Sequence, residues 1–334
     1  MVHLLLAIIY LSFISLGLPD ALLGAAWPNM YLELNTSISY AGIIFMIISV
    51  GTVISSLLSD RLLRILGTGK MTAISVAATA IAIFGISISD SFLMLCLWAI
   101  PYGLGAGCVD AGLNNYVAVH YSSTHMSWLH CMWGLGATIG PYVMGYMLSG
   151  GYHWTDGYHI IGVFQVVITI VLFFTLSLWE KEASKNKESI LAPLSLKEVL
   201  KIPGVKELML TFFCYCAIEQ TTGLWASSYL VLHKGIDSNT AASFASMFFI
   251  GITVGRAING FLSFKLNDTQ LIRLGQVIIG VQMASAYVGN ILMPPLFGWI
   301  AENISIRLFP VYLVMILMLM VAMYKRMLSK QNKL

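Results

Sequence analysis

Charged residues are scarce in this chain of 334 residues. Asp, Glu, Lys and Arg make up 10% of the sequence, whereas soluble domains contain about 25%. Hydrophobic residues account for 58%, and the mean hydropathy is +0.83. This balance excludes a soluble globular protein. It indicates a helical protein that crosses a membrane several times, because the apolar segments are continuous and do not alternate as in a membrane β-barrel.

Several features of other protein classes are missing as well. All five cysteines (Cys96, Cys108, Cys131, Cys214 and Cys216) fall inside apolar stretches, whereas a disulfide framework or a zinc site would place them in aqueous loops. No basic cluster is interleaved with aromatic residues, which excludes nucleic-acid binding. The sequence also lacks a nucleophile–base pair and metal-ligand spacing. We therefore expect no enzyme, no metal and no cofactor.

Long apolar stretches are what the chain has in quantity. About 20 apolar residues are needed for a helix to cross the hydrocarbon core. Such stretches predict ten transmembrane helices, near residues 4–27, 38–58, 69–88, 91–117, 127–149, 157–179, 206–231, 240–262, 271–300 and 305–324. A polar interruption at 180–205 predicts a cytoplasmic linker. It separates an N-terminal half of six helices (1–179) from a C-terminal half of four (206–334).

The basic residues predict the orientation. With the N-terminus in the cytoplasm, all but two of the 18 Lys and Arg residues fall on the cytoplasmic side, the exceptions being Lys234 and Arg307. This distribution follows the positive-inside rule. We therefore expect an integral protein of the plasma or inner membrane with both termini in the cytoplasm.

An internal repeat relates the two halves. Gly51-Thr-Val-Ile-Ser55-Ser56 returns as Gly251-Ile-Thr-Val-Gly255-Arg256 at an offset of 200 residues. Gly136, Pro141 and Gly145 return as Gly289, Pro294 and Gly298 at an offset of only 153, so 47 fewer residues separate these markers in the second half. This difference corresponds to about two helices. We interpret the chain as a six-plus-six protein that has lost two spans, with a fusion near Gly280-Val281-Gln282.

Three carboxyls lie inside apolar stretches, namely Asp20, Asp110 and Glu219. An ionisable group in hydrocarbon costs at least ~2.5 kcal/mol, so such groups commonly line a pathway. A carboxyl shielded from water takes up a proton more readily, which makes Asp20 and Asp110 candidates for binding a proton or a solute. The alternative is a structural hydrogen bond between helices, with Asp110 held by Asn114 one turn later.

Further polar and aromatic residues predict the kind of solute. Asn114, Glu219 and Gln220 offer hydrogen-bond donors and acceptors, and Trp225 offers a flat apolar face. This combination suits a sugar, whose hydroxyls need hydrogen bonds and whose C–H faces pack on aromatic rings. A location in the membrane–water interface is the alternative for Trp225.

Charges after the second stretch predict a gate. Asp60, Arg61 and Arg64 would close the cytoplasmic side in one state of a carrier, with Arg256 in the equivalent position of the second half. The alternative is that these residues only set the topology.

The segment Ser56-Leu-Leu-Ser-Asp60-Arg61-Leu-Leu-Arg64 resembles the Gly-x-x-x-Asp-Arg-x-Gly-Arg motif of the major facilitator superfamily, with Ser56 and Leu63 in place of its glycines. Two further segments resemble the fucose-permease-like sugar:proton symporters. They are Gly17-Leu-Pro-Asp20-Ala-Leu-Leu-Gly24-Ala-Ala-Trp27-Pro28 and Gly103-Leu-Gly105-Ala-Gly107-Cys-Val-Asp110-Ala-Gly112-Leu-Asn114. The resemblance implies a bundle of two halves, with substrate binding and proton coupling at Asp20 and Asp110.

We therefore predict an all-α polytopic membrane protein that carries a small polar solute, a sugar, by proton symport with alternating access. The expected partners of this monomer are the solute, protons and the lipid bilayer. One alternative is a proton-coupled efflux antiporter, because Gly136-Ala-Thr-Ile-Gly140-Pro141 resembles an antiporter motif. Another is a non-transporting remnant or membrane interaction protein, because the second half is short.

Overall fold

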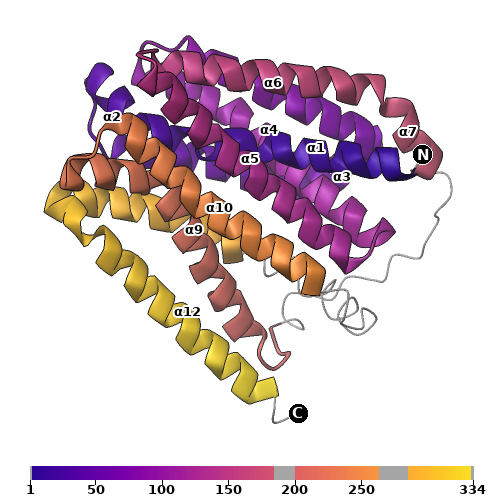
Figure 1. The fold of residues 1–334 in the computed structure, drawn as a ribbon. Coiled ribbons are helices and arrows are strands. Elements are labelled where there is room, and N and C mark those ends of the chain that lie inside the picture. Colours follow the sequence, from indigo (N-terminus) through magenta and orange to yellow (C-terminus); the bar gives the residue numbers. More distant parts are fainter. Residues whose placement is uncertain (1, 184–199, 263–284, 332–334) are drawn as a thin grey trace.

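The fold is known from a computed structural model that describes residues 2–183, 200–262 and 285–331 (Figure 1). Within these residues every regular element is a helix, which confirms the predicted all-α fold. In the same part of the chain, six helical stretches are long and apolar enough to cross a membrane. Most of the predicted linker, the first part of the ninth predicted span and the predicted fusion at 280–282 lie outside the described residues.

The first predicted span consists of two helices, α1 (Val2–Asp20) and α2 (Leu22–Glu33), with a break at Ala21. Pro19 contributes to this break because proline has no N–H to donate to the carbonyl of Ser15, four residues earlier. That carbonyl accepts a hydrogen bond from the Gln165 side chain instead. Asp20 therefore sits at an interruption of the helix, next to a backbone that is satisfied from a neighbouring helix.

The second and third predicted spans form the two helical arms of α3 (Tyr40–Ser87). The arms are joined at Gly67, whose φ of 73° is a left-handed conformation that glycine adopts readily. α4 (Phe92–His120) packs along α3 at its glycines. For example, the Thr52 hydroxyl donates to the Gly103 carbonyl at 3.3 Å.

Three helices complete the N-terminal half: α5 (Ser123–Ser149), α6 (Trp154–Phe174) and the short α7 (Leu176–Ala183). The sixth span was predicted to run to residue 179, but α6 ends at Phe174. At this point the Thr175 hydroxyl donates to the carbonyls of Val171 and Leu172, which ends the regular helix.

The C-terminal half contains α9 (Val205–Lys234), α10 (Ser238–Leu262), a helical segment at 285–300 and α12 (Phe309–Gln331). A π-helical turn at Ala301–Ser305 and a 3₁₀ turn at Ile306–Leu308 reverse the chain before α12. The two halves meet where α5 runs beside α10 and where α2 packs on α9 (Figure 1).

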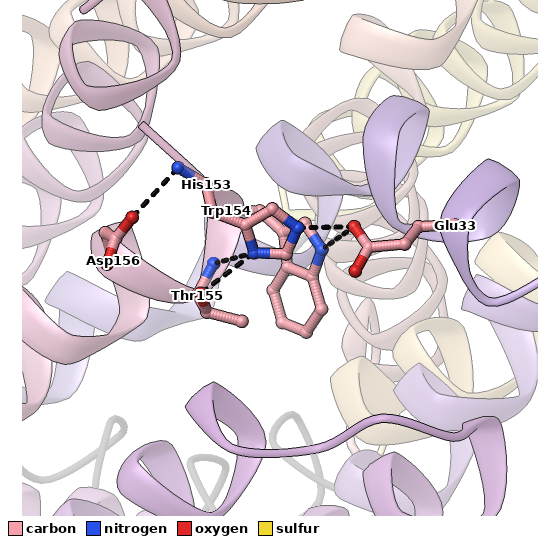
Figure 2. Close-up of polar contacts among 5 residues, drawn as sticks. All are labelled: Glu33, His153, Trp154, Thr155 and Asp156. Carbon is pink, nitrogen blue, oxygen red and sulfur yellow. Dashed lines mark hydrogen bonds and ion pairs between the residues drawn. The ribbon is translucent and has the colours of Figure 1, made fainter. Parts of the chain in front are cut away.

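A polar cluster holds the end of α2 against the start of α6 (Figure 2). One Glu33 carboxylate oxygen lies 2.5 Å from His153 Nε2 and accepts a 2.8 Å hydrogen bond from the Trp154 indole. His153 also begins α6, because its side chain accepts from the Thr155 N–H and its own N–H donates to Asp156. We call this end of the bundle the Glu33 end, and the opposite one the Gly67 end.

Candidate functional site

A cavity of about 270 Å³ lies between the two halves. The helices α1 to α6 contribute to its walls from one half, and α9, α10 and the segment 285–300 contribute from the other. All three carboxyls that were predicted to line a pathway face this cavity, together with Gln220 and Arg256. Residues from eight helices and the 285–300 segment are therefore brought to one site.

Asp20 is held by two donors from neighbouring helices. The Tyr102 hydroxyl of α4 donates to Asp20 Oδ1 at 2.8 Å, and the Trp133 indole of α5 donates to Asp20 Oδ2 at 2.7 Å. Tyr102 and Trp133 are both buried, so these contacts are shielded from bulk water. Both carboxylate oxygens of Asp20 thus have a partner within the N-terminal half.

Asp110 joins the two halves. Its Oδ1 accepts from Asn114 Nδ2 at 2.8 Å, one turn along α4. Its Oδ2 accepts from the hydroxyl of Tyr287, in the C-terminal half, at 3.1 Å. The same hydroxyl lies 3.1 Å from Ser56 Oγ on α3. Asn114 does not line the cavity itself and acts on it through Asp110.

Glu219 forms an ion pair with Arg256. Arg256 Nη2 lies 3.3 Å from Glu219 Oε2 and donates to the Tyr215 hydroxyl at 2.8 Å. Arg256 also reaches across to α5, where Nη1 donates to the His130 carbonyl at 3.2 Å. Arg256, which was predicted to act at a cytoplasmic gate, lies near the end of α10 and lines the cavity, and its gating role stays a prediction.

Trp225 lies outside the cavity, although it was predicted to offer its ring to the solute. It is fully buried, its indole donates to the Pro294 carbonyl at 2.8 Å, and its ring packs against Phe297. Trp225 follows Glu219 by six residues, which is about one and two-thirds helical turns, so the two side chains point in different directions.

The three residues of the predicted gate lie at the Gly67 end. Asp60, Arg61 and Arg64 are exposed on α3. In the described part of the chain, no residue forms a salt bridge or a hydrogen bond with their side chains. Their gating role stays a prediction.

Several lining residues were not singled out from the sequence: Tyr102, Trp133, Tyr215, Tyr287 and Asn290. His130 was not singled out either; because α5 begins at Ser123, His130 lies two turns inside the helix, against the cavity. Asn290 is notable because its buried Oδ1 has no hydrogen-bond partner among the described residues. This oxygen is free to accept a hydrogen bond from a bound molecule.

Comparisons with known proteins agree with this arrangement. Residues 9–281 match the model of the Major Facilitator Superfamily. The chain is 25% identical over 285 residues to Bypass of stop codon protein 6 of Saccharomyces cerevisiae, which covers 78% of this chain and 57% of that protein. It is 22% identical over 329 residues to the human Sodium-dependent glucose transporter 1, covering 88% and 62% respectively. For the Glucose/mannose transporter GlcP of Bacillus subtilis the identity is 22% over 251 residues, covering 72% and 61%. The chain therefore spans about three-fifths of the length of these relatives.

Solved structures show a similar fold. A peptide transporter POT in complex with alafosfalin superposes with a TM-score of 0.69 at 13% identity, covering 98% of this chain and 94% of that one. The nucleoside transporter NupG gives the same TM-score and identity, with coverages of 96% and 98%. At this identity the likeness concerns the fold alone.

Proposed function

This chain belongs to the major facilitator superfamily, and on that premise we propose that it carries a neutral sugar across the membrane together with protons. The family match identifies a membrane transporter and not an enzyme. Solute, coupling ion and mechanism are our proposal, which the cavity supports as follows.

The charges in the cavity favour a neutral solute. Among the described lining residues, three carboxyls (Asp20, Asp110 and Glu219) face one guanidinium, that of Arg256. An anionic solute would meet an excess of negative charge. If Asp20 and Asp110 each take up a proton, the remaining Glu219–Arg256 pair is neutral overall, which suits a neutral solute.

The size and surface of the cavity favour a sugar. Its volume of about 270 Å³ lies just below the range of about 300–1,000 Å³ that holds drug-sized ligands. The Tyr102 ring offers an apolar face, and the Gln220 and Asn290 amides offer donors and acceptors. Two of the relatives named above are called glucose transporters, which supports the same solute class.

The surroundings of the carboxyls favour protons over sodium as the coupling ion. Both oxygens of Asp20 and both of Asp110 already accept hydrogen bonds from side-chain donors. A proton can join such a carboxyl without further ligands, whereas a sodium ion requires several free oxygen atoms. The human relative is named as sodium-dependent, so sodium is the alternative to be tested.

Close contacts at the Glu33 end support alternating access. A Cβ added at Gly24 would lie 2.0 Å from the Gly223 carbonyl, and one at Gly42 would lie 2.9 Å from Pro295 Cα. Both contacts join the two halves. Separation of the halves at this end, which the basic residues predict to be extracellular, would open the cavity to solute.

Uptake into proteoliposomes tests the proposal. We expect labelled glucose or a related hexose to exchange in counterflow and to accumulate under an inward proton gradient without sodium. Asp110→Asn should retain counterflow and lose accumulation, whereas Asp156→Asn, at the Glu33 end, should resemble the wild type. Accumulation only with sodium would show that sodium, and not the proton, is the coupling ion. Sugar extrusion from preloaded vesicles under an opposing proton gradient would favour antiport. The absence of exchange with every sugar would contradict the proposal and favour a non-transporting role.

A further inference from the structure

Trp133 contacts the charged groups of both halves. Its indole N–H donates to Asp20 Oδ2 at 2.7 Å. The guanidinium carbon of Arg256 lies 4.7 Å from the centroid of the same ring, within the distance of a cation–π interaction. Arg256 in turn forms the ion pair with Glu219. One side chain therefore stands between a protonatable carboxyl of the N-terminal half and the ion pair of the C-terminal half.

The position of the Trp133 ring is fixed from several sides. The backbone of α5 touches α1, since a Cβ added at Gly17 would lie 2.1 Å from the Trp133 carbonyl. Phe249 of α10 packs edge-on against the ring, with centroids 6.2 Å apart. Trp133 is only 8% exposed. The ring therefore has little freedom to move away from either Asp20 or Arg256.

This arrangement has an electrostatic consequence. When Asp20 is charged, its carboxylate accepts strongly from the indole N–H, which makes the ring more electron-rich and strengthens its attraction for the guanidinium over its face. When Asp20 is protonated, both attractions weaken, and Arg256 then interacts mainly with Glu219 and Tyr215. The charge of Asp20 thus biases the position of Arg256, and with it the wall of the solute cavity.

We propose that Trp133 is a positioning residue that couples the protonation of Asp20 to the Arg256–Glu219 pair. This inference rests on the proposed function, because it concerns how proton and sugar binding are linked. Other titratable or charged groups also face the cavity around Asp20: Tyr102, Asp110, His130, Tyr158, Tyr215, Cys216, Glu219, Arg256 and Tyr287. Trp133 differs from all of them because it contacts Asp20 and the guanidinium at once.

Two substitutions separate the two contacts. Trp133→Phe keeps a ring beneath Arg256 and removes the N–H, whereas Trp133→Leu removes both. The matched control is Trp154→Phe, because the Trp154 indole also donates to a carboxylate, Glu33, but does so at the far end of the bundle (Figure 2).

The first measurement is sugar transport as a function of pH. We expect Trp133→Phe to retain counterflow within about threefold, while the midpoint of proton-driven accumulation shifts to higher pH by about one unit, a tenfold change in proton affinity. The shift is upward because the charged carboxylate loses a donor. Trp154→Phe should match the wild type. An unchanged midpoint in Trp133→Phe, or an equal loss of counterflow and accumulation, would overturn the inference.

The second measurement does not depend on transport. The effects of Asp20→Asn and Arg256→Gln on the melting temperature of the purified protein should be non-additive by about 2 °C or more, and should become additive in the Trp133→Leu background. Additive effects with Trp133 present would contradict the coupling. If the wild-type protein transports no sugar, the proposed function fails. The comparison of single and double variants by melting temperature still decides whether Trp133 couples Asp20 to Arg256.

Discussion

Asp110 and Tyr287 are 177 positions apart in the sequence, yet the Tyr287 hydroxyl lies 3.1 Å from a carboxylate oxygen of Asp110. The contact crosses the interface between the halves, at the cavity itself. It therefore links the carboxyl that we assign to proton binding with the part of the C-terminal half that follows the predicted deletion.

Removal of this hydroxyl should weaken transport. A hydrogen bond to a charged group contributes about 1.5–3 kcal/mol, so we expect Tyr287→Phe to lower proton-driven uptake about tenfold or more. Tyr312→Phe is the matched control, because the Tyr312 hydroxyl donates to the Met293 carbonyl away from the cavity. Equal uptake by the two variants would show that the contact with Asp110 is not used.

The Glu219–Arg256 pair predicts a pattern of single and double substitutions. Glu219 is 7% and Arg256 22% exposed, and breaking a buried pair by removing one partner costs about 3–5 kcal/mol. Arg256→Gln and Glu219→Gln should each lower the melting temperature by several degrees, and the double variant should recover much of the loss. Arg326→Gln is the control, since its 65% exposed side chain pairs with Glu207 at 3.6 Å and should contribute less than about 1 kcal/mol. A double variant less stable than either single one would argue against the pair.

Trp225 should matter for stability and not for the solute. Trp225→Phe leaves the buried Pro294 carbonyl without its donor, at a cost of about 1–3 kcal/mol. We expect a lower melting temperature and an unchanged sugar concentration for half-maximal uptake. Asn290→Ala should show the opposite pattern, because its free Oδ1 faces the cavity. A weaker apparent affinity of Trp225→Phe for the sugar would show that Trp225 takes part in solute binding.

Gly24 should control closure at the Glu33 end. Its Cβ position lies 2.0 Å from the Gly223 carbonyl, so Gly24→Val should force α2 and α9 apart. We expect a cysteine introduced at Met30, in a chain whose own cysteines are replaced, to react about tenfold faster with an impermeant thiol reagent applied from that side, as the open state gains population. Gly251→Ala is the control, because in the described part of the chain no atom outside its own helix backbone lies within 4 Å of its Cβ position. Unchanged labelling would show that the contact does not close the path.

The three carboxyls could be found from the sequence because charge is rare in apolar stretches. Their partners could not be found in the same way, since the chain has 15 Tyr and 8 Trp residues and these are ordinary in membrane helices. Helical spacing would have reduced the number of Tyr and Trp residues that could be partners of the carboxyls. Tyr102 and Asp110 are eight residues apart on α4, and Tyr215 and Glu219 are four apart on α9, so each pair shares a face. The same reasoning would have excluded Trp225.

Contacts between the two halves could not be predicted from the sequence for a different reason. Nothing in the spacing of α10 or of segment 285–300 indicates that Arg256 reaches Trp133 or that Tyr287 reaches Asp110. These contacts depend on how the two halves are docked. The junction at Gly67 falls between the second and third predicted spans, as the sequence indicated, whereas the break at Ala21 was missed because apolar composition continues across it.

The break at Ala21 and the cluster at Glu33 together restrict how α2 can move. The helix α2 has 12 residues and is therefore about 18 Å long. Its N-terminal end follows the break at Ala21, and Glu33 at its C-terminal end contacts His153 and Trp154 at the start of α6. The helix α2 cannot move outward while its C-terminal end stays bonded to α6. If the two halves separate on this side, as we propose, the movement is therefore that of α9 away from a stationary α2.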